Sequence, residues 1–423
     1  MAKTTTKDVE KMVANLGTTT KQVDYARTGC LMLDLLCGGG RGLGIPFGGM
    51  FSIVADTQIG KSFLANELIA KNYWEKKDKL LFNYDDVERG NSFDTESLYG
   101  VDIMGNSPYQ SDTIQKLDTN LKLFLDAKEK KKKMTHGIYV VDSLDFLNCD
   151  ANLAKQEKRV NAHVSGKDFS EGSYDMEKQK FLSGHLIPNN GQRVVDSNVL
   201  VVIISQIRDK INAMPFTPQY TISGGKAKEF AIHNRIFLKR KAKITKTVDG
   251  QDYVVGYYVE ASLQKARSPR PERKAYYTMY TDYGINDIES SLTYLFDLRD
   301  NAGKLKTEAN SIAWNISEDC EPKEKDNVLA WVEKHGLLDD MKAKKDGNWR
   351  YNLSYIEEYV FTLGTKEQQA DWTKTFGESY ALETLCTLID NDPAMKEELD
   401  KRTYDKWEAI EAQCRTPLKR KYG

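Results

Sequence analysis

Short runs of consecutive apolar residues alternate with amphipathic segments through the first half of the chain. The apolar runs are rich in β-branched residues and lie at Met50–Val54, Leu80–Tyr84, Ile138–Val141 and Val199–Ser205. Among them, apolar residues recur at helical spacing in Ser62–Lys71 and Thr113–Leu125. Uninterrupted apolar runs are typical of strands that are covered on both faces. Strands that alternate with helices predict an α/β fold with a mostly parallel sheet.

The second half has a different pattern. The residues predict antiparallel strands at Arg235–Lys243, Tyr253–Leu263 and Tyr276–Tyr280, and Asp249-Gly250 is typical of a hairpin turn. Beyond about residue 326 the spacing becomes helical in four segments: Asn327–His335, Leu353–Leu363, Tyr380–Ile389 and Asp405–Gln413. We therefore predict an N-terminal helical arm over residues 1–27, a core over 28–310 and a mainly helical C-terminal domain over 311–423.

Composition excludes several classes of protein. The 423 residues are 40% hydrophobic and 29% charged, which argues against collagen-like, mucin-like and globally disordered chains. The sequence has no apolar stretch of about 18 residues, so we expect no membrane span. Its start, Met1-Ala-Lys-Thr-Thr-Thr, has no short apolar region, so we expect no secretory signal. The six scattered cysteines form no CxxC pair and histidine occurs only five times. We therefore expect neither a disulfide framework nor a structural zinc site, and we expect a cytoplasmic location.

Charge is distributed unevenly along the chain. The formal net charge is −1, which by itself argues against a nucleic-acid partner. Residues 201–280, however, hold 15 Lys and Arg against 6 Asp and Glu, whereas residues 301–423 hold 19 against 24. The near-neutral total is a cancellation between a basic middle and a mildly acidic C-terminal third, and a basic middle suits a polyanionic partner.

One motif predicts a nucleotide site. An eight-residue segment that ends in Gly-Lys-Ser lies between an apolar strand and a helix, which is the setting of a P-loop. Backbone N–H groups of such a loop surround phosphates, the lysine reaches the β- and γ-phosphates, and the hydroxyl ligates Mg²⁺. The alternative is that Gly-Lys-Ser occurs here by chance and binds no phosphate. The candidate ATP ligands are Ala55, Asp56, Thr57, Gln58, Ile59, Gly60, Lys61 and Ser62.

Carboxylates at strand ends supply the other groups that such a site needs. Asp142 follows four apolar residues and is a candidate to hold Mg²⁺ through water; its alternative role is to cap the next helix. Asp85, Asp86 and Glu88 follow another apolar strand. Three acids so close would repel one another if all faced one site. We expect Glu88 to polarise the attacking water, with Asp86 as the second choice.

Taken together, these segments resemble the RecA-type recombinases, particularly bacterial RecA and its phage-encoded UvsX-like relatives. The resemblance runs in order from about Thr28 to Asn310. It rests on six segments: Thr28–Asp34, Ala55–Ser62, Val140–Ser143, Ile204–Ile211, Gly224–Phe230 and Gly284–Asn286. It implies a RecA-like P-loop NTPase core, with residues 1–27 as a polymerisation arm. The position of Glu88, counted back from Gly100, resembles that of the family's catalytic glutamate.

The resemblance also implies how the protein works. Such proteins bind ATP and Mg²⁺ between neighbouring subunits of a helical filament on single-stranded DNA, and pair that DNA with a homologous duplex. Gln206 is then the γ-phosphate sensor, and Lys265 and Arg267 complete the neighbour's ATP site. A DNA contact or a solvated strand end is the alternative for these two cations. A single-strand-binding protein and a loader are possible partners, and no membrane is expected.

Two DNA-binding loops follow from the same resemblance. Residues 207–223 and the segment after them would be the second loop, with cations for phosphates, aromatic rings for stacking and glycine N–H groups. Its candidates are Arg208, Lys210, Phe216, Tyr220, Gly224, Gly225 and Lys226. A surface hairpin with a flexible turn is the alternative. The first loop would lie within residues 150–195, where the weaker candidates are Lys167, Lys178, Lys180 and Arg193.

Two rival functions share the nucleotide motifs. A hexameric replicative helicase has the same core, and a recombination mediator has it without hydrolysing ATP. The region after residue 310 is longer than in bacterial RecA, has no residue-by-residue match to it and ends in basic residues. These departures favour a phage-encoded version of an ATP-dependent recombinase.

Overall fold

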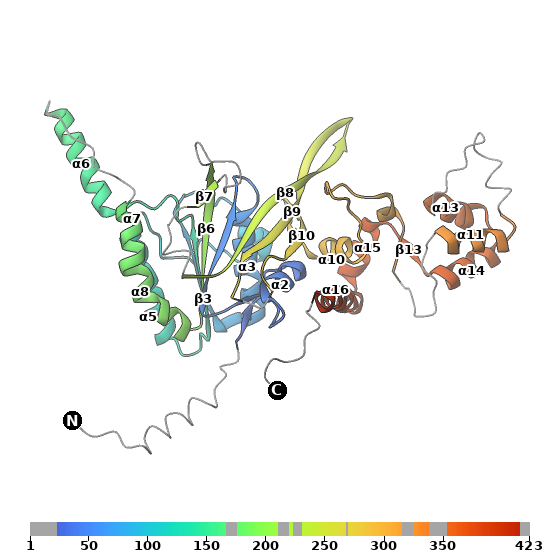
Figure 1. The fold of residues 1–423 in the computed structure, drawn as a ribbon, viewed down its shortest axis with the longest axis horizontal. Helices are drawn as coiled ribbons and strands as arrows, with labels where there is room; N and C mark the ends of the chain where they lie inside the picture. Colours follow the sequence, from blue (N-terminus) through green and yellow to red (C-terminus); the bar gives the residue numbers. More distant parts are fainter. Residues whose placement is uncertain are drawn as a thin grey trace, which may run out of the picture. The chain divides into compact units, whose positions relative to one another are not determined.

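The computed structural model describes residues 23–165, 176–209, 220–222, 231–267, 270–314, 325–337 and 353–414. A nine-stranded sheet has the order β11-β10-β9-β8-β3-β6-β5-β4, with β7 paired to β6 (Figure 1). Within this sheet, the pairs β4–β5, β5–β6, β6–β3 and β3–β8 are parallel. The predicted α/β fold with a mostly parallel sheet is therefore confirmed.

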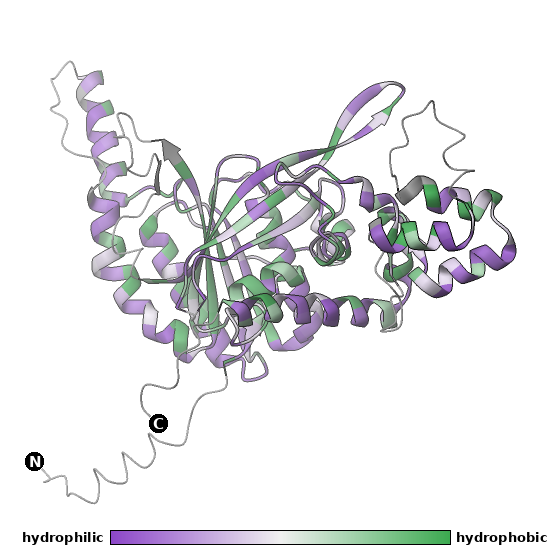
Figure 2. Cartoon of the chain, turned by 45° about the vertical axis from the view of Figure 1, so that its right-hand side comes forward, coloured by the Kyte–Doolittle hydropathy of each residue, from purple (hydrophilic) through white to green (hydrophobic). Residues whose placement is uncertain are grey.

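The four apolar runs form four consecutive strands of the sheet, with β4 at its edge. Each strand is slightly longer than its apolar run, because flanking residues extend the pairing: β3 (Gly49–Ala55), β4 (Leu80–Asp86), β5 (His136–Asp142) and β6 (Val199–Asp209). All seven residues of β3 are buried. Hydrophobic residues are concentrated along these strands (Figure 2). Because the strands are parallel, their carboxyl ends meet at one edge of the sheet.

Helices follow the strands as predicted. The first begins at Lys61, within the P-loop segment, and the second has Thr113 as its N-cap, whose hydroxyl accepts the N–H of Lys116. These helices are α3 (Lys61–Lys76) and α5 (Ile114–Lys130), each longer at its C-terminal end than the apolar spacing indicated. Leu117, Leu121 and Phe124 of α5 pack against β5 and β6 in one core cluster.

Shorter elements connect and flank these helices. Near the start of the described chain, β1 (Tyr25–Ala26) pairs with β2 (Ile45–Pro46), and α2 (Leu31–Gly38) lies between them in sequence. After β4 come α4 (Thr95–Tyr99) and α5. Residues 150–196 contain α6 (Asp150–Val164), α7 (Met176–Phe181), a π-helical turn (Leu182–Leu186) and α8 (Ile187–Asp196). Helix α6 is exposed along most of its length and largely hydrophilic (Figure 2).

A long hairpin extends the sheet beyond its buried part. It consists of β8 (Ile232–Val248) and β9 (Gln251–Lys265), and the predicted turn residues Asp249 and Gly250 have φ values of 52° and 77°. Left-handed values at both turn positions are typical of a tight hairpin. Strands β10 (Lys274–Tyr280) and β11 (Gly284–Asn286) form an antiparallel pair at the edge. The three predicted strands are thus confirmed, and all three are longer than predicted.

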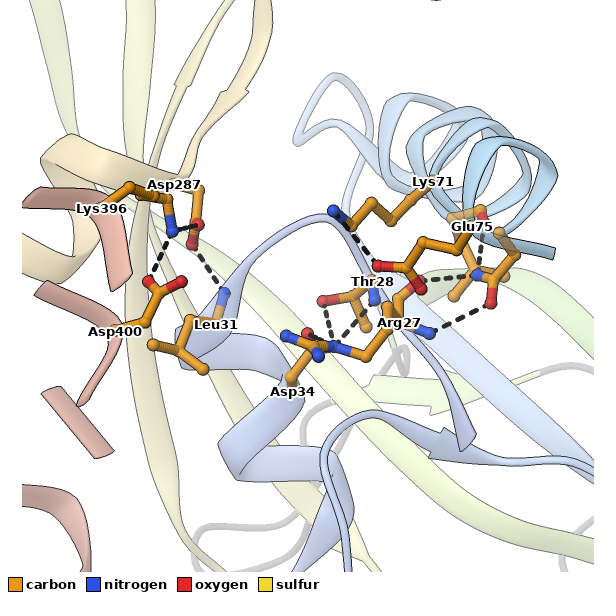
Figure 3. Close-up of polar contacts among 11 residues, drawn as sticks. Arg27, Thr28, Leu31, Asp34, Lys71, Glu75, Asp287, Lys396 and Asp400 are labelled. Atoms are coloured by element: carbon orange, nitrogen blue, oxygen red, sulfur yellow. Dashed lines mark hydrogen bonds and ion pairs between the residues drawn. The ribbon is translucent and has the colours of Figure 1, made fainter. Parts of the chain in front are cut away.

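The chain divides into two compact units. One comprises residues 1–29, 33–238 and 262–274, and the other residues 30–32, 239–261 and 275–423. The predicted limits at 27/28 and 310/311 remain predictions. In the first unit, Asp34 is buried and accepts the Thr28 N–H at 2.7 Å and the Arg27 Nε at 2.6 Å (Figure 3). These hydrogen bonds fix the chain where it enters the core.

The second unit is mainly helical in its C-terminal part. Two hydrophobic clusters stabilise it, one centred on Trp314 and Leu385 and one on Trp331 and Trp372. Its helices are α10 (Asp287–Leu295), α11 (Lys325–Lys334), α13 (Leu353–Leu363), α14 (Lys366–Phe376), α15 (Leu382–Asn391) and α16 (Pro393–Gln413). A small pair of strands, β12 (Ile312–Ala313) and β13 (Ser379–Tyr380), accompanies them.

Polar contacts in the second unit join residues that are far apart in the sequence. The Asp287 carboxylate at the start of α10 accepts the Leu31 N–H at 2.7 Å and pairs with Lys396 of α16 at 3.0 Å (Figure 3).

Among the described residues, no helix combines the length and apolar character that crossing a bilayer requires.

Candidate active site

The segment between β3 and α3 has the geometry of a phosphate-binding loop. Gly60 has a φ of 86° immediately before α3, a left-handed conformation that favours glycine. Lys61 is 8% exposed, and its Nζ donates to the carbonyl oxygens of Asp56 at 2.6 Å and Ala55 at 3.4 Å. Burial lowers the pKa of Lys61, and nearby carboxylates oppose that shift. A lysine ammonium and the N–H groups of a helix start therefore lie together.

The rest of this loop is divided between solvent and core. Asp56, Thr57 and Gln58 are exposed, and the Asp56 carboxylate accepts the Thr57 N–H at 2.7 Å. Gln58 has a φ of 57°. Ile59 is buried and anchors the loop to the core. The exposed part of the loop is thus accessible to a ligand while its base is fixed.

The candidate metal ligands lie beside this loop. The Ser62 hydroxyl at the start of α3 donates to Oδ2 of Asp142 at 2.6 Å. Asp142 ends β5 and is 6% exposed. Burial raises its pKa, whereas hydrogen bonds from Ser62 and Tyr84 lower it. Hydroxyl and carboxylate oxygens are ligands that Mg²⁺ prefers, so this donor set fits a magnesium–nucleotide complex.

The acids after β4 have different environments. Asp85 is fully buried and accepts hydrogen bonds from the hydroxyls of Ser111 at 2.6 Å and Tyr139 at 2.8 Å. Asp86 accepts two backbone N–H groups of the following turn, at 3.0 and 3.2 Å. Both carboxylates therefore satisfy local polar groups. The third acid, Glu88, is the one that faces the neighbouring strand ends.

Glu88 and Gln206 contact each other. The Gln206 amide Nε2 donates to Oε1 of Glu88 at 3.2 Å, and the Ser143 hydroxyl donates to the same oxygen. The Gln206 backbone N–H donates to Oδ2 of Asp145 at 2.9 Å. Lys61, Glu88 and Gln206 thus follow or lie near the ends of the strands β3, β4 and β6, and β5, which ends in Asp142, lies between β4 and β6. This geometry favours Glu88 over Asp86 as the carboxylate of the site.

Sequence reasoning missed two residues that hold this constellation. Tyr84 is fully buried on β4, and its hydroxyl donates to Oδ2 of Asp142 at 2.5 Å. Asp145 fixes the backbone of Gln206, as described above. Alternation along β4 puts Tyr84 on the same face as Asp86, which was the available signal for the first. No local pattern indicates the second, because it lies in an irregular turn.

The paired cations lie at the opposite end of the sheet from the P-loop of the same chain. Strand β8 runs parallel to β3, with Ile232 opposite Met50 and Leu238 opposite Ala55. Lys265 ends β9, and the Arg267 N–H donates to the side chain of Asn234, near the start of β8. Since a strand rises by 3.3 Å per residue, the cations and the P-loop are roughly 15 Å apart along the sheet.

A half-buried histidine lies close to these cations. Burial, together with the charges of Arg267 and Lys265, lowers the pKa of His233 to about 4. The imidazole is therefore neutral near pH 7, and it adds no charge to the pair.

The structure describes part of the second candidate DNA loop. The backbone of β6 pairs with β7 (Tyr220–Ile222) in an antiparallel ladder that places Arg208 opposite Thr221 and Asp209 opposite Tyr220. The base of this loop is therefore an antiparallel pair of strands. The remaining candidates lie outside the described residues: Lys210, Phe216, Gly224, Gly225 and Lys226.

Candidates for the first DNA loop mostly have internal partners. Lys178 donates to the carbonyl oxygens of Leu144 at 2.6 Å and Asp145 at 3.3 Å. Arg193 pairs with acidic residues of α5, at 2.7 and 3.0 Å. Lys180 pairs with Glu177 on its own helix, and Lys167 lies outside the described residues. The position of a first loop stays open.

Comparisons with known proteins place the chain in a family. The sequence model of the RecA N-terminal domain matches residues 3–286, about two thirds of the chain. The chain is also 24% identical over 303 residues to the protein RecA of Phytoplasma mali (strain AT), an alignment that covers 70% of this chain and 80% of that protein. The matched range includes every described residue of the candidate nucleotide site. The chain therefore belongs to the RecA family.

Proposed function

We propose that this protein is an ATP-dependent homologous recombinase, which forms helical filaments on single-stranded DNA and catalyses pairing and strand exchange with a homologous duplex. The contact between Glu88 and Gln206 supports this proposal most directly. It joins the carboxylate suited to polarise water to the residue that precedes the candidate DNA loop. A change in Gln206 on binding ATP would therefore reach residues that contact DNA.

The residues of the site have distinct roles in this proposal. The N–H groups at the start of α3 and the Lys61 ammonium bind the ATP phosphates. Ser62 and Asp142 would hold Mg²⁺, which neutralises charge on the phosphate oxygens when it is bound. Glu88 accepts a hydrogen bond from the attacking water and orients it. Gln206 reports the γ-phosphate to the loop that β6 and β7 frame.

Lys265 and Arg267 act on a neighbouring subunit in this proposal. Their separation from their own P-loop, roughly 15 Å along the sheet, supports a role in trans, because a charge at that distance interacts only weakly with the phosphates. A head-to-tail arrangement of subunits brings the two ends of the sheet together. Each ATP would then be bound by one subunit and completed by the next, as an arginine finger does.

In this proposal, the DNA contacts come from the second loop and from the residues directly after it. Arg208 and Lys210 neutralise phosphates, Phe216 and Tyr220 stack on bases, and Gly224, Gly225 and Lys226 add N–H groups and a charge. A phage origin and cooperation with a single-strand-binding protein or a loader belong to the same proposal.

Electron microscopy tests the proposal. The full chain is mixed with single-stranded DNA and a non-hydrolysable ATP analogue, and strand exchange is measured in parallel with ATP. We expect helical filaments and joint molecules. Closed six-membered rings with unwinding activity would establish the helicase instead. Filaments without ATP hydrolysis stimulated by DNA would favour a mediator.

A further inference from the structure

A buried tyrosine hydroxyl is hydrogen-bonded to the candidate metal-binding carboxylate. Tyr84 has no exposed surface, and its hydroxyl donates to Oδ2 of Asp142 at 2.5 Å. The Ser62 hydroxyl donates to the same oxygen at 2.6 Å. One carboxylate oxygen therefore accepts two hydroxyl donors, one from the centre of β4 and one from the first turn of α3.

Several contacts prevent Tyr84 from moving. In the parallel ladder it lies opposite Val140 of β5. Its N–H donates to the Ser107 hydroxyl at 2.8 Å, and its carbonyl oxygen accepts from the Gln110 side chain at 2.8 Å. Ser107 in turn donates to the carbonyl oxygen of Ile103 at 2.7 Å. The position of the tyrosine hydroxyl is thus set by the fold, independently of any nucleotide.

Ser62, by contrast, belongs to the loop that must respond to a nucleotide. A serine hydroxyl has one hydrogen and two lone pairs, so while it donates to Asp142 its lone pairs remain available to a cation. This orientation of the Ser62 hydroxyl depends on the side-chain conformation of the Asp142 carboxylate. The hydrogen bond from Tyr84, a residue whose position the fold fixes, holds the carboxylate in that conformation. Outer partners of this kind commonly change metal affinity by about 10- to 100-fold.

We propose that Tyr84 is a positioning residue for Mg²⁺ binding: its hydroxyl fixes the Asp142 carboxylate, which in turn aims the Ser62 oxygen at the metal ion. The inference rests on the proposed nucleotide site and names a residue that the P-loop motif does not contain. It assigns a function to a residue in the middle of a buried strand, where packing alone requires only an aromatic ring.

Replacement of Tyr84→Phe tests this role because it removes one oxygen atom. The readout is the binding of a fluorescent ATP analogue as MgCl₂ is titrated, with a parallel titration in EDTA. We expect the Mg²⁺ concentration for half-saturation to rise by about 10-fold. Binding in EDTA should stay within about twofold of wild type, since the hydroxyl does not touch the nucleotide.

The chain offers a matched control. Tyr139 is equally buried on the adjacent strand β5, and its hydroxyl donates to the Asp85 carboxylate at 2.8 Å. Tyr139→Phe therefore removes the same kind of hydrogen bond on the face of β4 away from Asp142. We expect its Mg²⁺ half-saturation to match wild type. Equal rises in both variants would overturn the proposal, because they would reflect a general loss of rigidity.

The outcomes separate this inference from the proposed function. If the wild-type protein binds the analogue without any Mg²⁺ dependence, the nucleotide site itself is wrong. If wild type and Tyr84→Phe share one Mg²⁺ half-saturation, the site stands and the role of Tyr84 is refuted. Should Tyr84→Phe fail to fold, replacement of Tyr84 by 4-fluorophenylalanine fills the hydroxyl's space without donating a hydrogen bond. The same rise in half-saturation is expected from it, and an unchanged value overturns the proposal.

Discussion

The three acids after Tyr84 could be told apart only by their partners in three dimensions. Asp85 and Asp86 satisfy hydroxyl and backbone N–H groups, whereas Glu88 contacts Gln206 across the strand ends. We expect Glu88→Gln to bind ATP and DNA like wild type, because the amide keeps the shape of the side chain. ATP turnover stimulated by single-stranded DNA should fall by about 100-fold, since the amide cannot accept a proton from water.

Asp86→Asn is the comparison for that variant. Its amide keeps one oxygen for the turn that follows, so we expect a modest loss of thermal stability with turnover near wild type. If Asp86→Asn instead binds ATP tightly and turns over slowly, the catalytic carboxylate has been misassigned by two residues.

Asp34 predicts a dependence of stability on pH. Burial raises its pKa to about 6, although Arg27 and Thr28 donate to it. Because an unfolded aspartate has a pKa near 3.8, the folded protein binds the proton more readily. This contribution to stability is present in full below about pH 4 and is lost as the pH rises through about 6. The shift corresponds to roughly 3 kcal/mol.

Urea unfolding of wild type and Asp34→Asn at pH 5 and pH 7.5 measures this effect. We expect wild type to lose more stability than the variant between the two values. Asp94 provides a contrast, because it is exposed and its hydrogen bonds to Ser97 lower its pKa. Asp94→Asn should leave the wild-type change between these pH values intact. Identical pH profiles for wild type and Asp34→Asn would contradict the assignment.

At the scale of the elements, helix α13 has the bounds that the sequence predicted, and the strands that are covered on both faces were predicted to within about four residues of their length. The apolar runs revealed β3, β5 and β6 because burial imposes one kind of residue at every position. The outer hairpin of β8 and β9 is exposed, so its residues carry no such pattern and the strands were predicted too short. Helix α16 (Pro393–Gln413) was recognised only over its last nine residues for a related reason, since two of its buried residues, Thr403 and Glu411, are polar and interrupt the apolar spacing.

The candidate site shows the same limit. Local motifs identified Lys61, Ser62 and Asp142, because a phosphate loop and a strand-end acid are defined by neighbouring residues. The contacts of Tyr84 with Asp142 and of Asp145 with Gln206 join residues that are 58 and 61 positions apart. Such pairs depend on strand order, which the sequence left undetermined.

The β6–β7 hairpin leads to a prediction about DNA. Arg208 lies in its ladder, at the base of the candidate loop. We expect Arg208→Ala to weaken binding to single-stranded DNA and to reduce the slope of log affinity against log salt by about 1, as the loss of one phosphate contact does. Fluorescence anisotropy of labelled oligonucleotides across a salt series measures both quantities.

Arg193→Ala is the matched control for Arg208. Arg193 already pairs with Asp126 and Glu129, so its removal should leave the salt slope unchanged. A reduced slope for Arg193→Ala together with a normal one for Arg208→Ala would move the DNA site from the hairpin to α8.

At the scale of the whole molecule, each active site is proposed to need two subunits. The P-loop and the paired cations lie at opposite ends of one sheet. A filament of identical, head-to-tail contacts can therefore contain as many complete sites as interfaces, while an isolated subunit contains none. This arrangement would make ATP hydrolysis depend on assembly, and it can be tested by mixing two defective variants.

Glu88→Gln lacks the proposed general base but keeps the cations, and Lys265→Ala/Arg267→Ala has the reverse defect. Each variant alone should hydrolyse ATP slowly. In an equal mixture on single-stranded DNA, one interface in four pairs a normal Glu88 with a normal pair of cations, so we expect about a quarter of wild-type turnover. Cations acting within their own subunit would give no recovery at any ratio. A recovery that rises and falls with the mixing ratio, and peaks at equal amounts, would instead require that every ATP lie between a P-loop and the next subunit's cations.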